Sequence, residues 1–154
     1  MVMRKTTTAV TPTATFHEII LREWQRRLGL EDWALSIDGA CDRSMLEPIQ
    51  AAGAIEYNEL SKRGKIYVMD ENDYNALAAD QAAVTPYDWE EIVVHELLHA
   101  KLSLIYSGYG TLQERYVHQL IDDLARALVD AKRSQDIPLL ELEDLDEDDD
   151  VEIL

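Results

Sequence analysis

The chain has little cysteine, few basic residues and no long apolar run. A single cysteine, Cys41, excludes an intramolecular disulfide, so nothing indicates an oxidising compartment. Lys and Arg number 14 against 31 Asp and Glu, and the net charge of −17 argues against a nucleic-acid backbone or an anionic membrane as the main partner. No apolar run approaches the ~20 residues needed to cross a bilayer, and the first residues do not resemble a secretory signal. We therefore expect a soluble cytoplasmic protein.

The acidic residues are concentrated at the end of the chain. Residues 134–154 contain ten Asp or Glu and no Lys or Arg. A block such as Asp146 to Asp150 repels itself and stays solvated, whereas the threonine-rich residues 1–15 lack apolar periodicity. We predict a flexible arm over 1–15, a folded domain over 16–133 and an acidic tail over 134–154. Apolar residues within the tail leave open a second interpretation, in which it is an interaction peptide or an autoinhibitory strap.

The first half of the predicted domain contains one helix and a small sheet. Apolar residues spaced three and four apart predict a helix over 16–28, and Gly29 follows where a helix C-cap belongs. Three further segments have the composition of strands: 33–38, 54–58 and 65–69. Because the loop between the last two is short, we expect a sheet of about three antiparallel strands.

Two long helices are predicted in the second half. Thr85 and Pro86 form a typical helix start, and the helix that follows is apolar around almost its whole circumference, which predicts burial. Gly108 and Gly110 should end it. A last helix over 112–132 carries an apolar stripe formed by Val117, Leu120, Ile121, Leu124 and Leu128. The order of helix, small sheet, central helix and closing helix predicts an α+β fold.

The predicted central helix contains the sequence His95-Glu96-Leu97-Leu98-His99. Two histidines four residues apart project from the same face of a helix and can ligate one ion. Glu96 lies ~100° round the helix from His95, so it can reach a metal-bound water without ligating the metal. Without an ion, a buried helix would enclose these groups unpaired, each at a cost of roughly 1–3 kcal/mol. The motif therefore predicts one zinc ion per chain.

A third ligand has to come from another segment. The metzincin extension requires glycine at 102 and histidine at 105, and Leu102 and Ile105 exclude that class. Projecting back along the apolar stripe of the last helix reaches His118 and then Glu114, so both are expected on its inward face. A carboxylate that faces a core needs a cation or strong hydrogen-bond donors. Glu114 and His118 are therefore both candidates.

The pattern Glu114-x-x-x-His118, downstream of the His-Glu-x-x-His helix, resembles the gluzincin metallopeptidases. The resemblance is closest to compact members: the minigluzincins, the immunity-repressor (ImmA/IrrE-type) metallopeptidases and small phage-encoded metallopeptidase-like proteins. It implies zinc on His95, His99 and Glu114, with Glu96 as catalytic base and a peptide or protein as substrate. His118 stands where these proteins more usually have Asn or Asp, and it is the alternative third ligand. The resemblance also implies the cytoplasm of a bacterium or of a phage-infected host.

The resemblance implies a hydrolytic mechanism. Zinc would lower the pKa of its bound water toward ~7 and polarise the scissile carbonyl, while Glu96 would move the proton from the water to the leaving amine. By analogy, the strand over 65–69 would align an extended substrate through backbone hydrogen bonds. We therefore predict a zinc-dependent peptidase. The alternative is a non-catalytic, zinc-stabilised or vestigial zincin module that acts as a phage or prophage regulator, or as an interaction protein, through its acidic tail.

Overall fold

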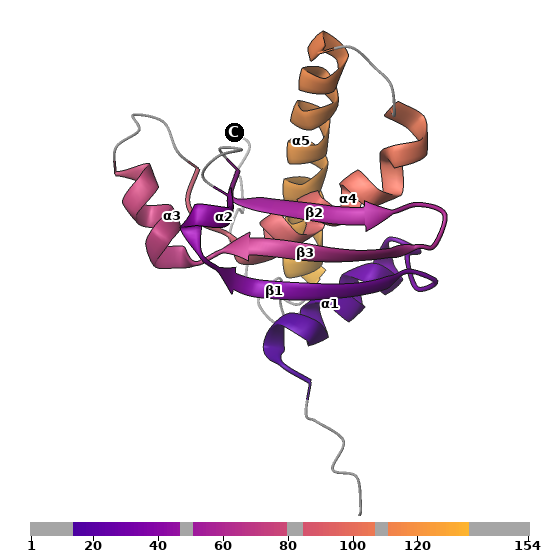
Figure 1. Ribbon diagram of the computed structural model, residues 1–154, viewed down its shortest axis with the longest axis horizontal. Helices are drawn as coiled ribbons and strands as arrows, with labels where there is room; N and C mark the ends of the chain where they lie inside the picture. Colours follow the sequence, from indigo (N-terminus) through magenta and orange to yellow (C-terminus); the bar gives the residue numbers. More distant parts are fainter. Residues whose placement is uncertain (1–13, 47–50, 80–84, 107–110, 136–154) are drawn as a thin grey trace, which may run out of the picture. The chain divides into compact units, whose positions relative to one another are not determined.

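The structure is a computed structural model that describes residues 14–46, 51–79, 85–106 and 111–135 (Figure 1). The chain forms two compact units, Met1–Tyr87 and Asp88–Leu154. The elements of the first unit are α1 (Phe16–Arg27), β1 (Ala34–Cys41), α2 (Arg43–Leu46), β2 (Gly53–Asn58), β3 (Arg63–Met69) and α3 (Glu71–Ala78). The second unit contains α4 (Trp89–Tyr106) and α5 (Thr111–Gln135). The predicted α+β fold class is confirmed.

Some of the sequence predictions fall on parts of the chain that the structure does not describe. The predicted arm and tail lie almost entirely there, as do Gly108 and Gly110, and the single domain over 16–133 stays a prediction.

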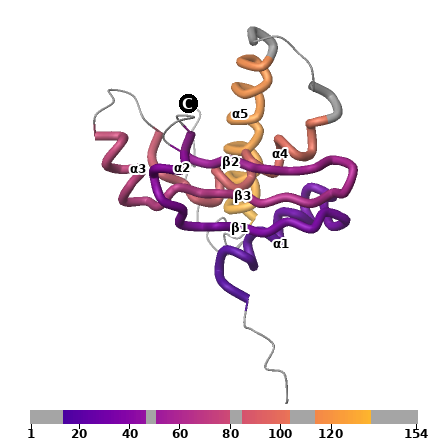
Figure 2. Tube along the Cα trace, in the orientation of Figure 1, coloured from indigo at the N-terminus to yellow at the C-terminus, as the bar shows by residue number. Residues whose placement is uncertain are grey.

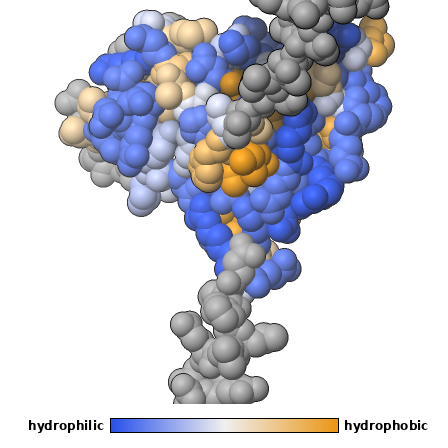
Figure 3. Space-filling view, turned by 90° about the horizontal axis from the view of Figure 1, so that it is seen from below, coloured by the Kyte–Doolittle hydropathy of each residue, from blue (hydrophilic) through white to orange (hydrophobic). Residues whose placement is uncertain are grey.

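Among the described helices, none is long and apolar enough to cross a membrane. Hydrophilic residues cover most of the coloured surface in Figure 3, and apolar residues gather there in a patch.

Helix α1 forms as its sequence predicts. Thr15 accepts a hydrogen bond from the backbone N–H of Glu18, and the Glu18 carboxylate accepts one from the backbone N–H of Thr15, which is a capping box. One side of the helix buries Leu21 and Trp24. Gly29 follows the helix with a φ of 64°, a left-handed conformation that glycine adopts without steric cost.

The three predicted strands form one sheet in the order β1-β3-β2 (Figures 1 and 2). Strands β2 and β3 pair antiparallel across a short turn, in which Lys62 has a φ of 51°. Strand β1 pairs with β3 in parallel, and the prediction of an entirely antiparallel sheet was wrong on this point. Residues 42–52, which contain α2, separate β1 from β2. A connection of this length does not require β1 and β2 to pair as a hairpin, and β3 lies beside β1 instead.

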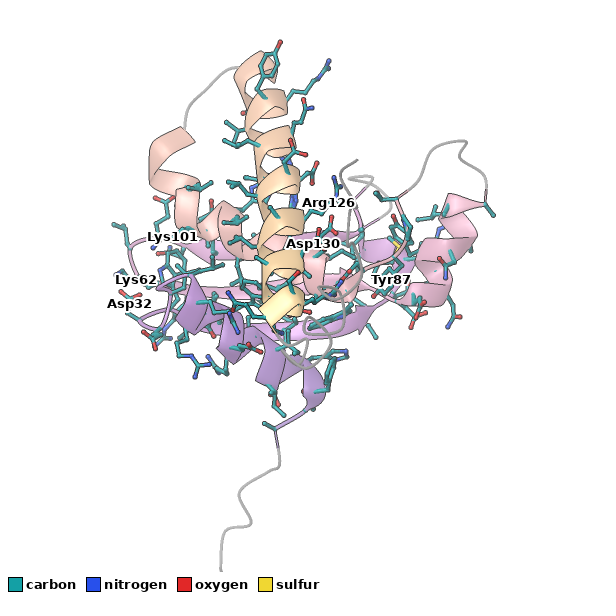
Figure 4. All side chains as sticks on the ribbon, turned by 180° about the vertical axis from the view of Figure 1, so that it is seen from behind. Asp32, Lys62, Tyr87, Lys101, Arg126 and Asp130 are labelled. Atoms are coloured by element: carbon teal, nitrogen blue, oxygen red, sulfur yellow. The ribbon has the colours of Figure 1, made fainter. Side chains whose placement is uncertain are left out.

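Lys62 also ties the start of β1 to the turn before β3. Its carbonyl oxygen accepts a hydrogen bond of 2.8 Å from the backbone N–H of Ala34, and its ammonium group pairs with Asp32 (Figure 4). Because the strand order is β1-β3-β2, β3 is the central strand and pairs with a neighbouring strand on each side. Residues 65–69 therefore cannot align a substrate as an added strand, which corrects the expectation drawn from the zincin analogy.

The core of the first unit includes a cluster at one end of the sheet. Cys41, Leu46 and Met69 are buried there. Burial raises the pKa of the Cys41 thiol, so this cysteine is a packing residue rather than a nucleophile. The hydroxyl of Tyr87 donates a hydrogen bond of 2.8 Å to the carbonyl oxygen of Met69. Helix α3, which was not predicted, begins where the side chain of Asp70 caps its first turn.

Helix α4 begins three residues later than predicted. Asp88 accepts a hydrogen bond of 3.1 Å from the backbone N–H of Glu91, which is the hydrogen bond of an N-cap. Thr85 and Pro86 therefore precede the helix and do not form its first turn. The predicted burial of the helix is confirmed over its middle, where Val93, Val94 and Leu97 are fully buried.

Helix α5 packs antiparallel to α4. The carboxylates of Asp88 and Glu90, at the start of α4, pair with Arg133 and Lys132 at the end of α5, at 2.7 and 2.6 Å. The buried line of α5 consists of Ile121, Ala125 and Val129. The predicted stripe was partly wrong, because Leu120 and Leu124 are exposed. The residues that follow them in sequence, Ile121 and Ala125, are buried in their place.

Candidate metal centre

Three histidine side chains come together between α4 and α5. His95 and His99 project from α4, His118 projects from α5, and one potential ligand atom from each lies within 4.8 Å of the others. The Nε2 atoms of His95 and His99 are 3.0 Å apart. The ring of His118 has its centroid 4.6 Å from that of His99 and 5.7 Å from that of His95. The structure thus brings together the predicted histidine pair and the alternative third ligand.

The spacing of these imidazoles fits a tetrahedral metal ion. Zinc binds imidazole nitrogen at about 2.0–2.1 Å, so two nitrogens in a tetrahedral shell lie about 3.4 Å apart. The Nε2 atoms of His95 and His99 are 3.0 Å apart, which is slightly shorter than this distance. The ligand atoms of all three histidines lie within 4.8 Å of one another, which is up to about 1.4 Å longer. The three histidines are therefore a candidate site for a metal ion.

The environment keeps the α4 histidines in the form that binds metals. Burial, followed by the charges of His95 and His118, lowers the pKa of His99 to about 4. Burial also lowers the pKa of His95, although the neighbouring Asp122 opposes that shift. Both rings are therefore neutral at neutral pH. A neutral imidazole has a free nitrogen lone pair, which is what coordination requires.

Asp122 completes the surroundings of His95. Its Oδ1 lies 2.8 Å from Nδ1 of His95. A carboxylate at this position holds the proton on Nδ1 and leaves Nε2, which faces His99, free to bind a cation. Sequence reasoning missed Asp122, although one signal was present: it lies four residues after His118 and hence on the same face of α5.

Glu96 lies beside the cluster and is not part of it. Its side chain is buried, with 5% relative exposure, and its carboxylate does not belong to the group of metal-ligating atoms. Burial, with a smaller contribution from the negative charge of Asp122, raises its pKa to about 8. A divalent cation at the imidazoles would act in the opposite direction and favour the ionised carboxylate.

Glu114 lies outside the group that the structure brings together. The residue is exposed on the first turns of α5, and its carboxylate is not among the clustered ligand atoms. Its role as a zinc ligand stays a prediction from the gluzincin resemblance. The geometry instead favours His118, one helical turn further along α5.

Acidic side chains also occur on α4 and α5 close in sequence to the histidines. Glu91 precedes His95 by about one turn of α4, and Asp123 follows Asp122 on α5. Arg126 is within 3.6 Å of Glu91 and 4.0 Å of Asp123, and Figure 4 shows it on the same stretch of α5 as Asp130. One guanidinium thus pairs with a carboxylate of α4 and with a carboxylate of α5.

The comparisons with known proteins gave no match: no family model, curated protein or solved structure matches the chain. The gluzincin resemblance therefore depends on the short motifs of α4 and α5 alone. Zinc binding and peptidase activity have to be argued from the three-histidine cluster, Asp122 and Glu96.

Proposed function

We propose that the chain is a zinc-dependent peptidase, with zinc on His95, His99 and His118 and with Glu96 as general base. The observation that supports this proposal is the convergence of three imidazoles on a His-Glu-x-x-His helix, with ligand atoms within 4.8 Å of one another. When bound, zinc would supply a Lewis acid and a water of lowered pKa. The choice of peptides as substrates is based on the resemblance of the motif to the gluzincins.

The residues of the chain would divide the work of hydrolysis. Asp122 would hold His95 so that its Nε2 faces the metal position. Glu96 would accept a proton from the attacking water at a carboxylate oxygen and deliver it to the leaving amine. Its burial in a site of low dielectric would strengthen its electrostatic interaction with the reacting groups. A cytoplasmic location and a peptide or protein partner belong to the same proposal.

The second candidate is a structural zinc site in a non-catalytic module. The low exposure of Glu96 favours this function, because a general base has to reach a substrate and a water molecule. Three ligands from two antiparallel helices would also link α4 to α5, as structural sites link separate segments. Both candidates require zinc, and they differ in what Glu96 does.

The full chain loaded with one zinc per chain separates the two candidates. We expect it to cleave peptides in a mixture of unstructured peptides, and we expect Glu96→Gln to reduce the rate by about 10²–10⁴-fold while zinc stays bound. Glu91→Gln, on the same helix, is the matched control and should keep the activity. A zinc-loaded chain that cleaves no peptide would favour the structural site. Cleavage that survives Glu96→Gln would remove Glu96 from the mechanism.

A further inference from the structure

Helix α5 has a second apolar face that is exposed. Tyr116, Leu120 and Leu124 are 64%, 54% and 38% exposed, and their four-residue spacing places them along one side of the helix. Ala127 and Ala131 continue this side and are exposed as well. We call these five residues the α5 stripe. The buried line that faces α4 lies elsewhere on the helix, so its packing does not cover the α5 stripe. Contiguous exposed apolar surface of this kind is typical of a contact site.

The chain itself carries a segment that can reach the α5 stripe. Helix α5 ends at Gln135, and 19 residues follow it. The first ten of them include five large aliphatic residues: Ile137, Leu139, Leu140, Leu142 and Leu145. The acidic run Asp146 to Asp150 comes only after them. An apolar segment thus begins directly at the end of the helix whose apolar side is exposed.

The lengths of the helix and of this segment agree. At 1.5 Å per residue, Leu124 lies about 16 Å and Tyr116 about 28 Å from the end of α5. A chain that runs back along the helix at about 3.3 Å per residue covers these distances in about five and about nine residues. This register puts Leu140 near Leu124 and Leu142 near Leu120.

We propose that residues 137–145 fold back along α5 and cover the α5 stripe. In an extended segment, Glu141 and Glu143 would alternate with Leu140 and Leu142 and face water. The acidic run would then pass the first turn of α5, where the helix dipole favours negative charge. Because His118 and the α5 stripe are on different faces of the helix, the proposal does not depend on a metal or on catalysis.

Amide hydrogen exchange of the full chain tests this contact. We expect the amides of residues 137–145 to exchange about tenfold more slowly than those of an unstructured chain. Leu120→Gln combined with Leu124→Gln leaves the tail sequence unchanged and should remove most of this protection. Met45→Gln combined with Leu60→Gln is the matched control, since both residues are exposed apolar side chains of the first unit. The control should keep the protection.

A reciprocal variant keeps the test independent of the stability of α5. Leu140→Gln combined with Leu142→Gln changes only the tail and should shift the NMR methyl resonances of Leu120 and Leu124. Exchange of residues 137–145 at unstructured rates in the unchanged protein would overturn the proposal. Protection that survives in the Leu120 and Leu124 variant would also overturn it.

Two other occupants would give different results. If a second copy covered the α5 stripe, light scattering would show a dimer at high concentration. About hundredfold dilution would then dissociate this dimer and remove the protection of residues 137–145. If the acidic run bound the exposed Arg22 and Arg26 of α1, protection would be lost at about 1 M salt, where the Debye length is about 3 Å. Either result would overturn the proposal, because an intramolecular apolar contact survives both dilution and salt.

Discussion

Asp122 on α5 places its Oδ1 2.8 Å from Nδ1 of His95 on α4. This contact joins the two helices at the level of the histidine cluster, because His118 lies one turn before Asp122 on the same face of α5. One helical turn therefore offers both a candidate ligand and the group that orients another ligand. The His-Glu-x-x-His motif of α4 therefore does not include every residue of the candidate metal site, because His118 and Asp122 come from α5.

Removal of the Asp122 carboxylate should weaken metal binding. We expect Asp122→Ala to lower the zinc affinity by about 10–100-fold, because His95 then loses the partner that fixes its tautomer. A competition titration against a chelator of known affinity measures the change. Asp123→Ala removes the same charge one position further along α5 and should have little effect. Equal losses in both variants would mean that only the local negative charge matters.

The identity of the third ligand can be tested by two substitutions on α5. We expect His118→Ala to abolish stoichiometric zinc binding, because two histidines and water make a much weaker site than three histidines. Glu114→Ala should retain one zinc per chain, since the Glu114 carboxylate lies outside the cluster. Metal analysis after gel filtration measures the zinc content per chain of each variant. Loss of zinc in the Glu114 variant alone would restore the ligand set that the gluzincin resemblance implies.

The sequence predicted the parts of the site that depend on a single helix. His95 and His99 share a face because residues four apart always do in a helix, whatever lies beside it. On α5, the apolar stripe indicated both Glu114 and His118, but the choice between them and the role of Asp122 depend on how the two helices pack, which no local pattern specifies. Asp122 is one of 31 acidic residues in the chain, and its four-residue spacing from His118 becomes informative only once its contact with His95 is known.

The same division holds for the fold. All three strands were predicted, since alternation along a strand is local, but the parallel pairing of β1 with β3 was not, because pairing joins residues far apart in the chain. At the start of α4, both Thr85 and Asp88 are residue types that cap helices. The helix begins after Asp88, whose carboxylate also pairs with Arg133, a contact with α5 that sequence reasoning could not anticipate.

Removal of zinc should lower the stability of the protein. A ligand that binds only the folded state adds RT ln(1 + [L]/Kd), which is about 4 kcal/mol when the free metal is at a thousand times Kd. We therefore expect a lower melting temperature in excess chelator and its recovery when zinc is restored. The His99→Ala variant is the control, because its melting temperature should no longer respond to chelator. An unchanged melting curve of the unaltered chain in saturating chelator would count heavily against zinc binding.

The ion pair between Asp88 and Arg133 should stabilise the α4–α5 pair in a pH-dependent way. Arg133 donates two hydrogen bonds to the Asp88 carboxylate, at 2.7 and 3.0 Å. These hydrogen bonds lower the pKa of Asp88 below the usual 3.8. Because the folded pKa lies below the unfolded one, this stabilisation is complete above about pH 4 and is lost as the pH falls through the folded value.

Asp88→Asn isolates the ion pair, because asparagine caps a helix as well as aspartate does. We expect this substitution to lower the free energy of unfolding by about 0.5–1 kcal/mol at neutral pH. Urea denaturation should show this difference begin to shrink below about pH 4 and approach zero only below the lowered pKa of folded Asp88, where the unaltered chain is protonated at this residue as well. Arg133→Gln should cost no more once Asp88 is already asparagine, apart from the weaker 3.3 Å contact with Glu90. A difference that persists in acid would assign the effect of Asp88 to the cap and not to Arg133.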